Sequence, residues 1–202
     1  MKRVNVFDFD GVLIDSKEAH WKFYSDFAHA NGFSLRRRDF EKAISGQGEL
    51  FWENLGVPDE HVRGIQEDYT TEFWRYPVTF FGGVPEMLER LSASGAILTL
   101  ATFNRRANVE RAVKEHIKHF ERVFTFEDGR KEGCVQKLFD IYGGTPSDYR
   151  LIGDTRWDKD TSEGMGIGFL AVNYGWMKFR DDGLFPIVET VAELQDYLLR
   201  HP

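Results

Sequence analysis

Short apolar runs of strand length recur along the chain and alternate with stretches that have helical periodicity. Strands and helices that alternate at this spacing form βαβ units, in which the strands are parallel and the crossovers are right-handed. The sequence therefore predicts an α/β fold with a Rossmann-like parallel sheet. The apolar runs lie at 4–7, 96–101, 123–126, 151–152 and 169–172, and the helix-like stretches lie near 84–94, 105–119, 131–142, 158–165 and 189–200.

Residues 16–79 depart from this alternation, because they contain almost no strand-like run. They carry apolar stripes with helical spacing instead, of which the first runs from Ala19 to Ala30. The simplest interpretation is an all-helical module inserted after the first strand of the α/β domain. Further helices of this module are predicted near 36–44, 49–54 and 58–76.

Acidic and polar residues follow the predicted strands at the points where the strands end. Asp8 and Asp10 follow the first strand, and Thr102 follows the second. Asp154 follows the fourth, with Asp158 one helical turn later. In an open parallel sheet, ligands bind outside the carboxyl ends of the strands, so we expect these residues to converge. Converging carboxylates repel one another unless a hard divalent cation such as Mg2+ lies between them.

Four segments resemble, in order, the motifs of the haloacid dehalogenase (HAD) superfamily. Phe-Asp-Phe-Asp-Gly-Val-Leu-Ile-Asp-Ser at 7–16 resembles the first motif, and Ile-Leu-Thr-Leu-Ala-Thr at 97–102 resembles the second. Lys131 before a helix resembles the third, and Ile-Gly-Asp-Thr-Arg-Trp-Asp at 152–158 resembles the fourth. The helical insert resembles the C1-type cap of phosphoglycolate-phosphatase-like and β-phosphoglucomutase-like members.

The resemblance implies a HAD fold with two parts. Residues 1–15 and 80–202 would form the α/β catalytic core, and residues 16–79 would form the cap. In this family pattern Asp8 is the nucleophile that forms an aspartyl-phosphate, and Asp10 is the general acid and then the base.

The resemblance also implies how metal and phosphate are held. Mg2+ would be bound by the Asp8 carboxylate, the Asp10 backbone carbonyl and Asp154. Asp158 would act through a water molecule or by contacting the residues that bind the ion. Arg130 and Lys137 compete with Lys131 as the phosphate-binding cation, because the proline that often follows the family lysine is absent. The predicted phosphate-binding groups are the Thr102 hydroxyl, Lys131 and backbone amides at Gly11, Phe103 and Asn104.

Two residues of the insert are candidates for substrate contact. His20 matches a histidine that capped members often place in the active-site cleft, and a buried cap histidine is an equally good interpretation. Gln47 lies in a glycine-containing turn where related caps place their specificity loop. His116 and His119 have the spacing of a metal-binding pair, but no third ligand is evident, so we expect them at a solvated surface.

Charge and composition exclude several classes of protein. The net charge of −7 disfavours nucleic-acid and membrane-surface binding, and no stretch has the roughly 18 apolar residues of a membrane span. The single cysteine, Cys134, excludes an internal disulfide framework. We therefore expect a cytoplasmic protein. The resemblance to the HAD superfamily implies that its partner is a small phosphorylated metabolite, and the oligomeric state is left open.

The leading functional hypothesis is a Mg2+-dependent phosphatase acting on a small phosphomonoester. A phosphomutase of the β-phosphoglucomutase type is the enzymatic alternative, since it shares Asp8, Asp10 and a cap histidine. Mutase caps usually offer an arginine in the loop after the glycine, where this chain has Gln47. A regulatory module that keeps the fold without turnover is the third possibility.

Overall fold

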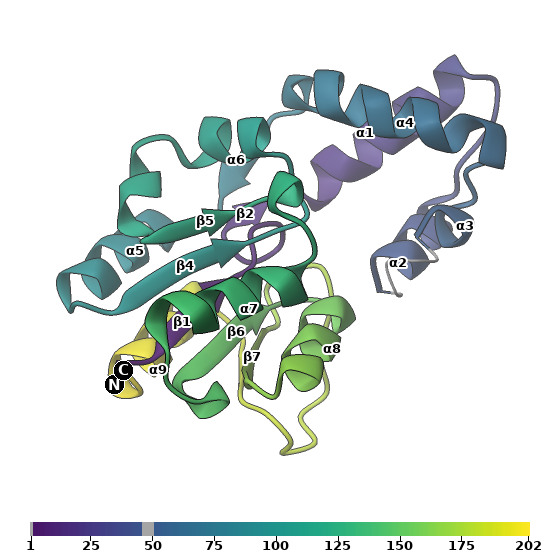
Figure 1. Ribbon diagram of the computed structural model, residues 1–202. Coiled ribbons are helices and arrows are strands. Elements are labelled where there is room, and N and C mark those ends of the chain that lie inside the picture. Colours follow the sequence, from purple (N-terminus) through teal and green to yellow (C-terminus); the bar gives the residue numbers. More distant parts are fainter. Residues whose placement is uncertain (1, 46–50) are drawn as a thin grey trace.

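A six-stranded parallel sheet forms the centre of the larger part of the molecule (Figure 1). The computed structural model describes residues 2–45 and 51–202. The strand order β5-β4-β1-β6-β7-β8 places the first strand in the middle of the sheet, and the predicted α/β fold is confirmed. The strands are β1 (Val4–Phe7), β4 (Ile97–Ala101), β5 (Arg122–Phe124), β6 (Tyr149–Gly153), β7 (Gly168–Val172) and β8 (Ile187–Val188).

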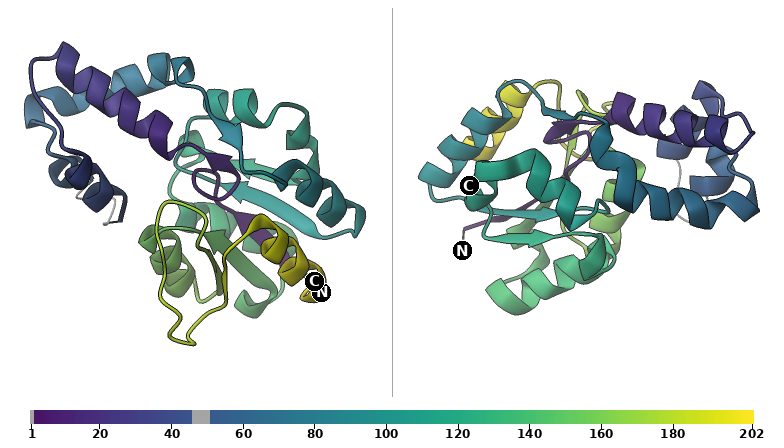
Figure 2. Two further views of the ribbon diagram at one scale, coloured as in Figure 1. Left: turned by 180° about the vertical axis from the view of Figure 1, so that it is seen from behind. Right: turned by 90° about the horizontal axis from the view of Figure 1, so that it is seen from above.

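Both faces of this sheet are buried, which explains why its strands are almost continuously apolar. Side chains alternate between two hydrophobic cores: Ile152 and Leu170 point to one face, and Leu151 and Phe169 point to the other. The first face is covered by α5 (Val84–Ala93), α6 (Arg106–Val113) and α9 (Val191–Arg200), and the second by α7 (Lys131–Tyr142) and α8 (Arg156–Met165) (Figure 2).

The connection between α6 and β5 differs from the single helix predicted over 105–119. The α-helix ends at Val113, and a 3-10 helix, η3 (Lys114–His119), follows it. Lys114 has φ 46° and is the one non-glycine residue with a positive φ in the described part of the chain. This left-handed residue changes the direction of the chain where no glycine signals a turn. Two further 3-10 turns, η4 (Phe126–Asp128) and η5 (Pro146–Asp148), lie in other connections.

A separate group of helices lies to one side of the sheet (Figures 1 and 2). Its core is formed by large aromatic side chains, among them Phe23, Phe27, Phe40 and Phe73, as expected for a small unit that needs bulky residues to exclude water. The helices are α1 (Lys17–Ala30), α2 (Arg37–Ser45), α3 (Phe51–Leu55), α4 (Asp59–Glu72) and the short η2 (Phe73–Arg75).

Two short antiparallel strands connect these helices to the sheet-containing part. They are β2 (Ile14–Asp15) and β3 (Thr79–Phe80), which pair with each other where the chain leaves and returns. We call the residues between them, 16–78, the helical segment. Strands of two residues are too short to leave a periodic pattern in the sequence, which is why they were not predicted.

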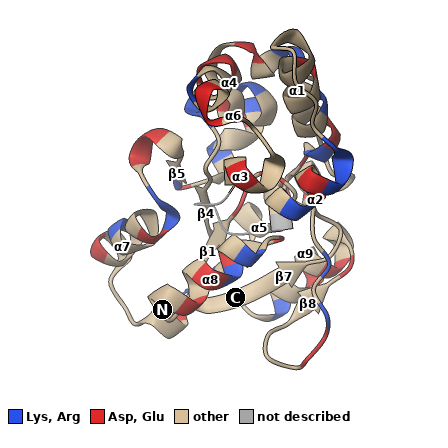
Figure 3. Cartoon of the chain, turned by 90° about the vertical axis from the view of Figure 1, so that its right-hand side faces the viewer, with Lys and Arg blue, Asp and Glu red and all other residues tan. Residues whose placement is uncertain are grey.

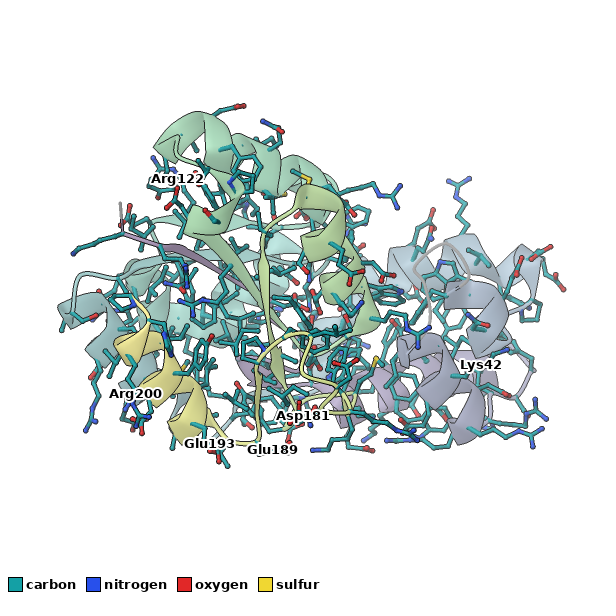
Figure 4. The ribbon with its side chains drawn as sticks, turned by 90° about the horizontal axis from the view of Figure 1, so that it is seen from below. Lys42, Arg122, Asp181, Glu189, Glu193 and Arg200 are labelled. Atoms are coloured by element: carbon teal, nitrogen blue, oxygen red, sulfur yellow. The ribbon has the colours of Figure 1, made fainter. Side chains whose placement is uncertain are left out.

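Charged side chains lie on the outer surface of both parts. Lys42 on α2 and Arg200 on α9 are exposed at opposite ends of the molecule (Figure 4). Both signs occur together on α2 and α8 (Figure 3), where Arg37 pairs with Glu41 and Lys159 pairs with Glu163. Among the helices in the described ranges, none has the length and apolar content needed to cross a membrane.

Candidate active site

Asp8 directly follows β1 at the centre of the carboxyl edge of the sheet. Its N–H donates to the carbonyl oxygen of Ile152 at 2.9 Å, and its Oδ1 lies 2.8 Å from Nζ of Lys131. Burial first, and then the neighbouring Asp158, raise the pKa of Asp8 to about 7, although Lys131 acts in the opposite direction. The carboxylate therefore needs more positive charge than Lys131 provides to stay fully ionised at neutral pH.

Lys131, the first residue of α7, is buried between two carboxylates. Its Nζ lies 2.8 Å from Asp8 Oδ1 and 2.5 Å from Asp158 Oδ1. Burial alone would lower the pKa of Lys131, but Asp158 and Asp8 raise it, so its ammonium group is charged. Lys137 is exposed and donates to the carbonyl oxygen of Asp128 instead, and Arg130 is also exposed. Of these three predicted alternatives, the structure brings Lys131 to Asp8.

Asp8, Asp154 and Asp158 form a buried carboxylate cluster in which one oxygen of each lies within 4.8 Å of the others. Asp154 Oδ2 accepts the N–H of Trp176 at 2.5 Å, whereas its Oδ1 is buried without a hydrogen-bond partner among the described residues. Burial, and then Asp158 and Asp8, raise the pKa of Asp154 well above its usual range. Three carboxylates face one ammonium group, so the cluster fits a hard divalent cation that balances its charge and binds the unpartnered oxygen.

Asp158 also lies in the first turn of α8, where it stabilises the start of the helix. Its Oδ2 accepts both the N–H and the hydroxyl of Thr155, at 3.1 and 2.5 Å, in a capping box at the start of α8. Its Oδ1 pairs with Lys131. Because Asp158 is fully buried, this residue does more than solvate a helix start.

Two glycines leave room for Asp154 beside the loop that follows β1. Gly11 has φ +78°, and a Cβ atom there would lie 1.9 Å from Asp154 Oδ2. A Cβ atom on Gly175 would lie 2.4 Å from the same oxygen. Any side chain at either position would displace Asp154, so both glycines are required by close approach.

Asp10 lies beside the cluster and is held by two hydrogen bonds. Its Oδ1 accepts the hydroxyl of Ser16 at 2.6 Å, and its Oδ2 accepts the side-chain amide of Asn104 at 2.9 Å. The N–H of Asn104 donates to Thr102 Oγ1 at 3.0 Å. The backbone N–H of Asn104, which was predicted to bind phosphate, is therefore already bonded to Thr102, and the side chain of Asn104 orients Asp10. The Thr102 hydroxyl proton stays available to a ligand.

A cavity of about 350 Å3 opens above these groups, between the sheet edge and the helical segment. Asp8, Asp10, Thr102 and Lys131 lie on its lining. The rest of the lining is rich in aromatic side chains: Tyr24, Phe51, Trp52, Tyr69, Phe103, Phe126, Trp157 and Trp176. The side chains of Phe103 and Phe126 are 44% and 48% exposed, respectively. A concave, mostly apolar lining with a few polar groups is typical of ligand-binding sites, and exposed large apolar side chains are common there.

His20 both lines this cavity and is buried. Its Nδ1 lies 2.9 Å from the carbonyl oxygen of Ser16, and its Nε2 lies 3.0 Å from the hydroxyl of Tyr69. A carbonyl oxygen only accepts, so Nδ1 carries the proton and Nε2 accepts from Tyr69. Burial lowers the pKa of His20, and the neutral ring positions Tyr69 and α1. Gln47 lies outside the described residues.

Sequence reasoning missed several groups at the site. The backbone N–H of Trp176 donates to Asp154, and the indole ring packs on His20 with centroids 4.9 Å apart. It follows the strand predicted at 169–172, so the rule that found Asp154 could have found it as well. The guanidinium of Arg105 lies 4.0 Å from the centroid of Phe126 at the cavity, and no local sequence signal indicates that pair.

Comparison with known proteins identifies related chains. The sequence profile described as haloacid dehalogenase-like hydrolase matches residues 5–172. A 5'-nucleotidase of Pseudomonas aeruginosa is 25% identical over 190 residues, which cover 85% of this chain and 82% of that protein. A haloacid dehalogenase-like family hydrolase of Streptococcus pneumoniae has the same fold, with a TM-score of 0.82, 19% identity and coverage of 97% and 98%. A predicted phosphoglycolate phosphatase of Haemophilus somnus superposes with a TM-score of 0.80 at 14% identity, covering 97% and 98%.

Proposed function

The chain belongs to the haloacid dehalogenase-like hydrolase family, and from that premise we propose that it is a Mg2+-dependent phosphatase. In this proposal it hydrolyses a small phosphomonoester through an aspartyl-phosphate. The observation that supports this most directly is the pair Asp8–Lys131, buried at the cavity lining beside an Asp10 side chain that two hydrogen bonds orient.

In the first step, a carboxylate oxygen of Asp8 attacks the phosphorus atom and the ester oxygen leaves. Lys131 and the Thr102 hydroxyl hold the phosphate oxygens, which carry most of the charge in such a transfer. Asp10 donates a proton to the leaving alcohol oxygen. In the second step, Asp10 takes a proton from water as the water oxygen attacks the phosphorus, which releases phosphate and restores Asp8.

The carboxylate cluster is the proposed metal site. Mg2+ would be held by Asp8, Asp154 and the backbone carbonyl of Asp10, and Asp158 would support this site without binding the ion directly. Bound Mg2+ supplies positive charge that neutralises the phosphate oxygens. Asp158 would keep Lys131 in place through the ion pair at 2.5 Å, so the ammonium group stays directed at the phosphate.

We also propose that residues 16–79 act as a cap over the core formed by 1–15 and 80–202. This division is supported by the β2–β3 pair, where both chain crossings meet, and by the cavity, to which both parts contribute. The part contributed by the helical segment is His20, Tyr24, Phe51, Trp52, Gln66 and Tyr69.

The aromatic lining favours a phosphomonoester whose leaving group carries a planar ring. Aromatic side chains stack on such rings and gain about 0.5–1.5 kcal/mol beyond area burial. A nucleoside monophosphate and an aryl phosphate both satisfy this requirement. The Pseudomonas aeruginosa relative is named a 5'-nucleotidase, which makes nucleoside 5'-monophosphates the first substrates to test.

The proposal is tested by measuring phosphate release from p-nitrophenyl phosphate and from a panel of phosphorylated metabolites. We expect turnover with Mg2+, loss of turnover with EDTA, and recovery when Mg2+ is added back. An unchanged rate in EDTA would contradict the metal requirement. An isomerised sugar phosphate without free phosphate would support the mutase, and Mg2+ binding without turnover of any ester would support the non-catalytic module.

Replacing Phe126 by leucine tests the role of the aromatic lining. We expect KM to rise about 2- to 10-fold for p-nitrophenyl phosphate or a nucleoside monophosphate, because a stacking contact is lost. KM for glycerol phosphate, which has no ring, should not change. Ile141→Ala is the matched control, since Ile141 is an exposed apolar side chain that does not line the cavity. Equal changes for both esters would contradict the stacking role.

A further inference from the structure

A second group of metal-ligating side chains lies outside the cavity that contains Asp8. Glu89 comes from α5, and His116 and His119 come from η3. One ligand atom of each residue lies within 4.8 Å of the other two. The structure thus supplies the third ligand that the sequence did not reveal, because Glu89 is brought to the histidines by the packing of α5 against η3.

Both imidazole rings have a nitrogen without a partner. Nδ1 of His116 and Nε2 of His119 are buried, and neither has a hydrogen bond within the described residues. The two rings are inclined to each other by 29°, with centroids 5.9 Å apart. Buried polar atoms are nearly always satisfied, so an unpartnered nitrogen on each of two neighbouring rings leaves both imidazoles with a free ligand atom. The prediction that these histidines are merely solvated does not account for this arrangement.

The local backbone explains why the rings face the same way. On a 3-10 helix, residues three apart are eclipsed, so His116 and His119 extend from one side of η3. The helix begins at Lys114, whose φ of 46° is unfavourable for a residue with a Cβ atom. Strain of this kind persists where the surrounding structure requires it, and it is found at functional sites.

The chemistry of the three donors selects the type of ion. Two imidazoles and one carboxylate are the ligands of three-ligand Zn2+ sites that keep a fourth position open. Mg2+ prefers oxygen ligands throughout and is a poor match for two imidazoles.

We propose that Glu89, His116 and His119 form a second metal site, which binds Zn2+ or a similar borderline divalent ion and is separate from the carboxylate cluster. A bound ion would fix η3 to α5. It would also lie next to the strand by which the chain returns from the helical segment, because the ring of Phe80 in β3 packs on His116 with centroids 5.4 Å apart.

Co2+ binding to the 202-residue chain, stripped of metal and then saturated with Mg2+, tests this site. Co2+ absorbs visible light according to its ligands, so it distinguishes a histidine-containing site from an all-oxygen one. We expect one equivalent of Co2+ to bind with a histidine-type spectrum and Zn2+ to displace it. We also expect the melting temperature to rise with added Zn2+.

The variants His119→Gln and Glu89→Gln keep side-chain size and should weaken Co2+ binding at least about tenfold, the scale on which ligand environments affect affinity. His29→Gln is the matched control, since His29 is exposed on α1. Asp154→Asn, which alters only the carboxylate cluster, should leave the Co2+ spectrum intact. No binding in Mg2+-saturated protein, or equal binding by wild type and the correctly melting His119→Gln protein, would overturn the proposal.

Discussion

Asp8→Asn is expected to lower phosphate release from every substrate by about 10,000-fold or more, the scale seen when a covalent enzyme loses its nucleophile. The amide nitrogen and oxygen of asparagine do not form a stable acyl-phosphate, so the first step has no acceptor. The measurement is steady-state phosphate release by purified wild-type and variant protein with Mg2+ present.

The same substitution is expected to leave the fold intact, so that a loss of activity can be assigned to the missing nucleophile and not to unfolding. Asp8 is buried next to Asp158, and its ionised form is disfavoured there, as its raised pKa of about 7 indicates. Lys131 loses one partner but keeps Asp158 at 2.5 Å. The melting temperature of metal-free Asp8→Asn should therefore equal or exceed that of the wild type. A large fall in melting temperature would show that Asp8 is chiefly structural.

Asp15→Asn provides the control for this measurement. Asp15 belongs to the same acidic run of sequence, but it lies on β2 and its side chain is exposed. We expect wild-type activity for this variant. If Asp8→Asn retained activity as Asp15→Asn does, the aspartyl-phosphate mechanism would be wrong.

The parts of the site that follow strand ends were predictable from sequence. Asp8 and Asp154 were expected to converge because parallel strands bring their carboxyl ends to one edge, a rule that depends on topology and not on side-chain packing, and the structure brings them together. The same rule applied to the strand at 168–172 would have found Trp176, whose N–H binds Asp154. Trp176 was missed because the rule was not applied to this strand, although the sequence contains the information.

Side-chain contacts between distant segments were not predictable. Asn104 was predicted to donate its backbone amide to phosphate, whereas its side chain binds Asp10 and its N–H binds Thr102. Which way an asparagine turns depends on groups brought near by folding, and the local sequence does not contain them. The same reason explains why Glu89 was not foreseen beside His116 and His119.

Local backbone conformation was also missed where no glycine or proline indicates it. A single helix was predicted over 105–119, but Lys114 adopts a positive φ and separates α6 from η3. Lysine is a good helix former, so propensity alone argues for continuation. The tertiary structure overrides that preference here, and the result is the orientation of the two histidines that the second metal site requires.

Asp10→Asn is expected to affect the two steps of the reaction unequally. The variant cannot protonate the leaving oxygen or activate water, and general acid–base catalysis of this kind contributes about 100- to 10,000-fold. An alkyl phosphate needs the proton in the first step, so its turnover should fall across that range. The p-nitrophenolate ion leaves without a proton, so the first step with p-nitrophenyl phosphate should be much less affected.

This asymmetry predicts a burst for Asp10→Asn in rapid-mixing experiments with p-nitrophenyl phosphate. One equivalent of p-nitrophenolate should appear quickly, followed by slow release limited by hydrolysis of the aspartyl-phosphate, because the second step still lacks its base. Ser16→Ala removes one of the two hydrogen bonds that orient Asp10. This variant should lose less activity and show no burst, since the Asp10 carboxylate is still present. Equal losses for both esters and no burst in Asp10→Asn would contradict the acid–base role, because they would mean that Asp10 supports binding and not proton transfer.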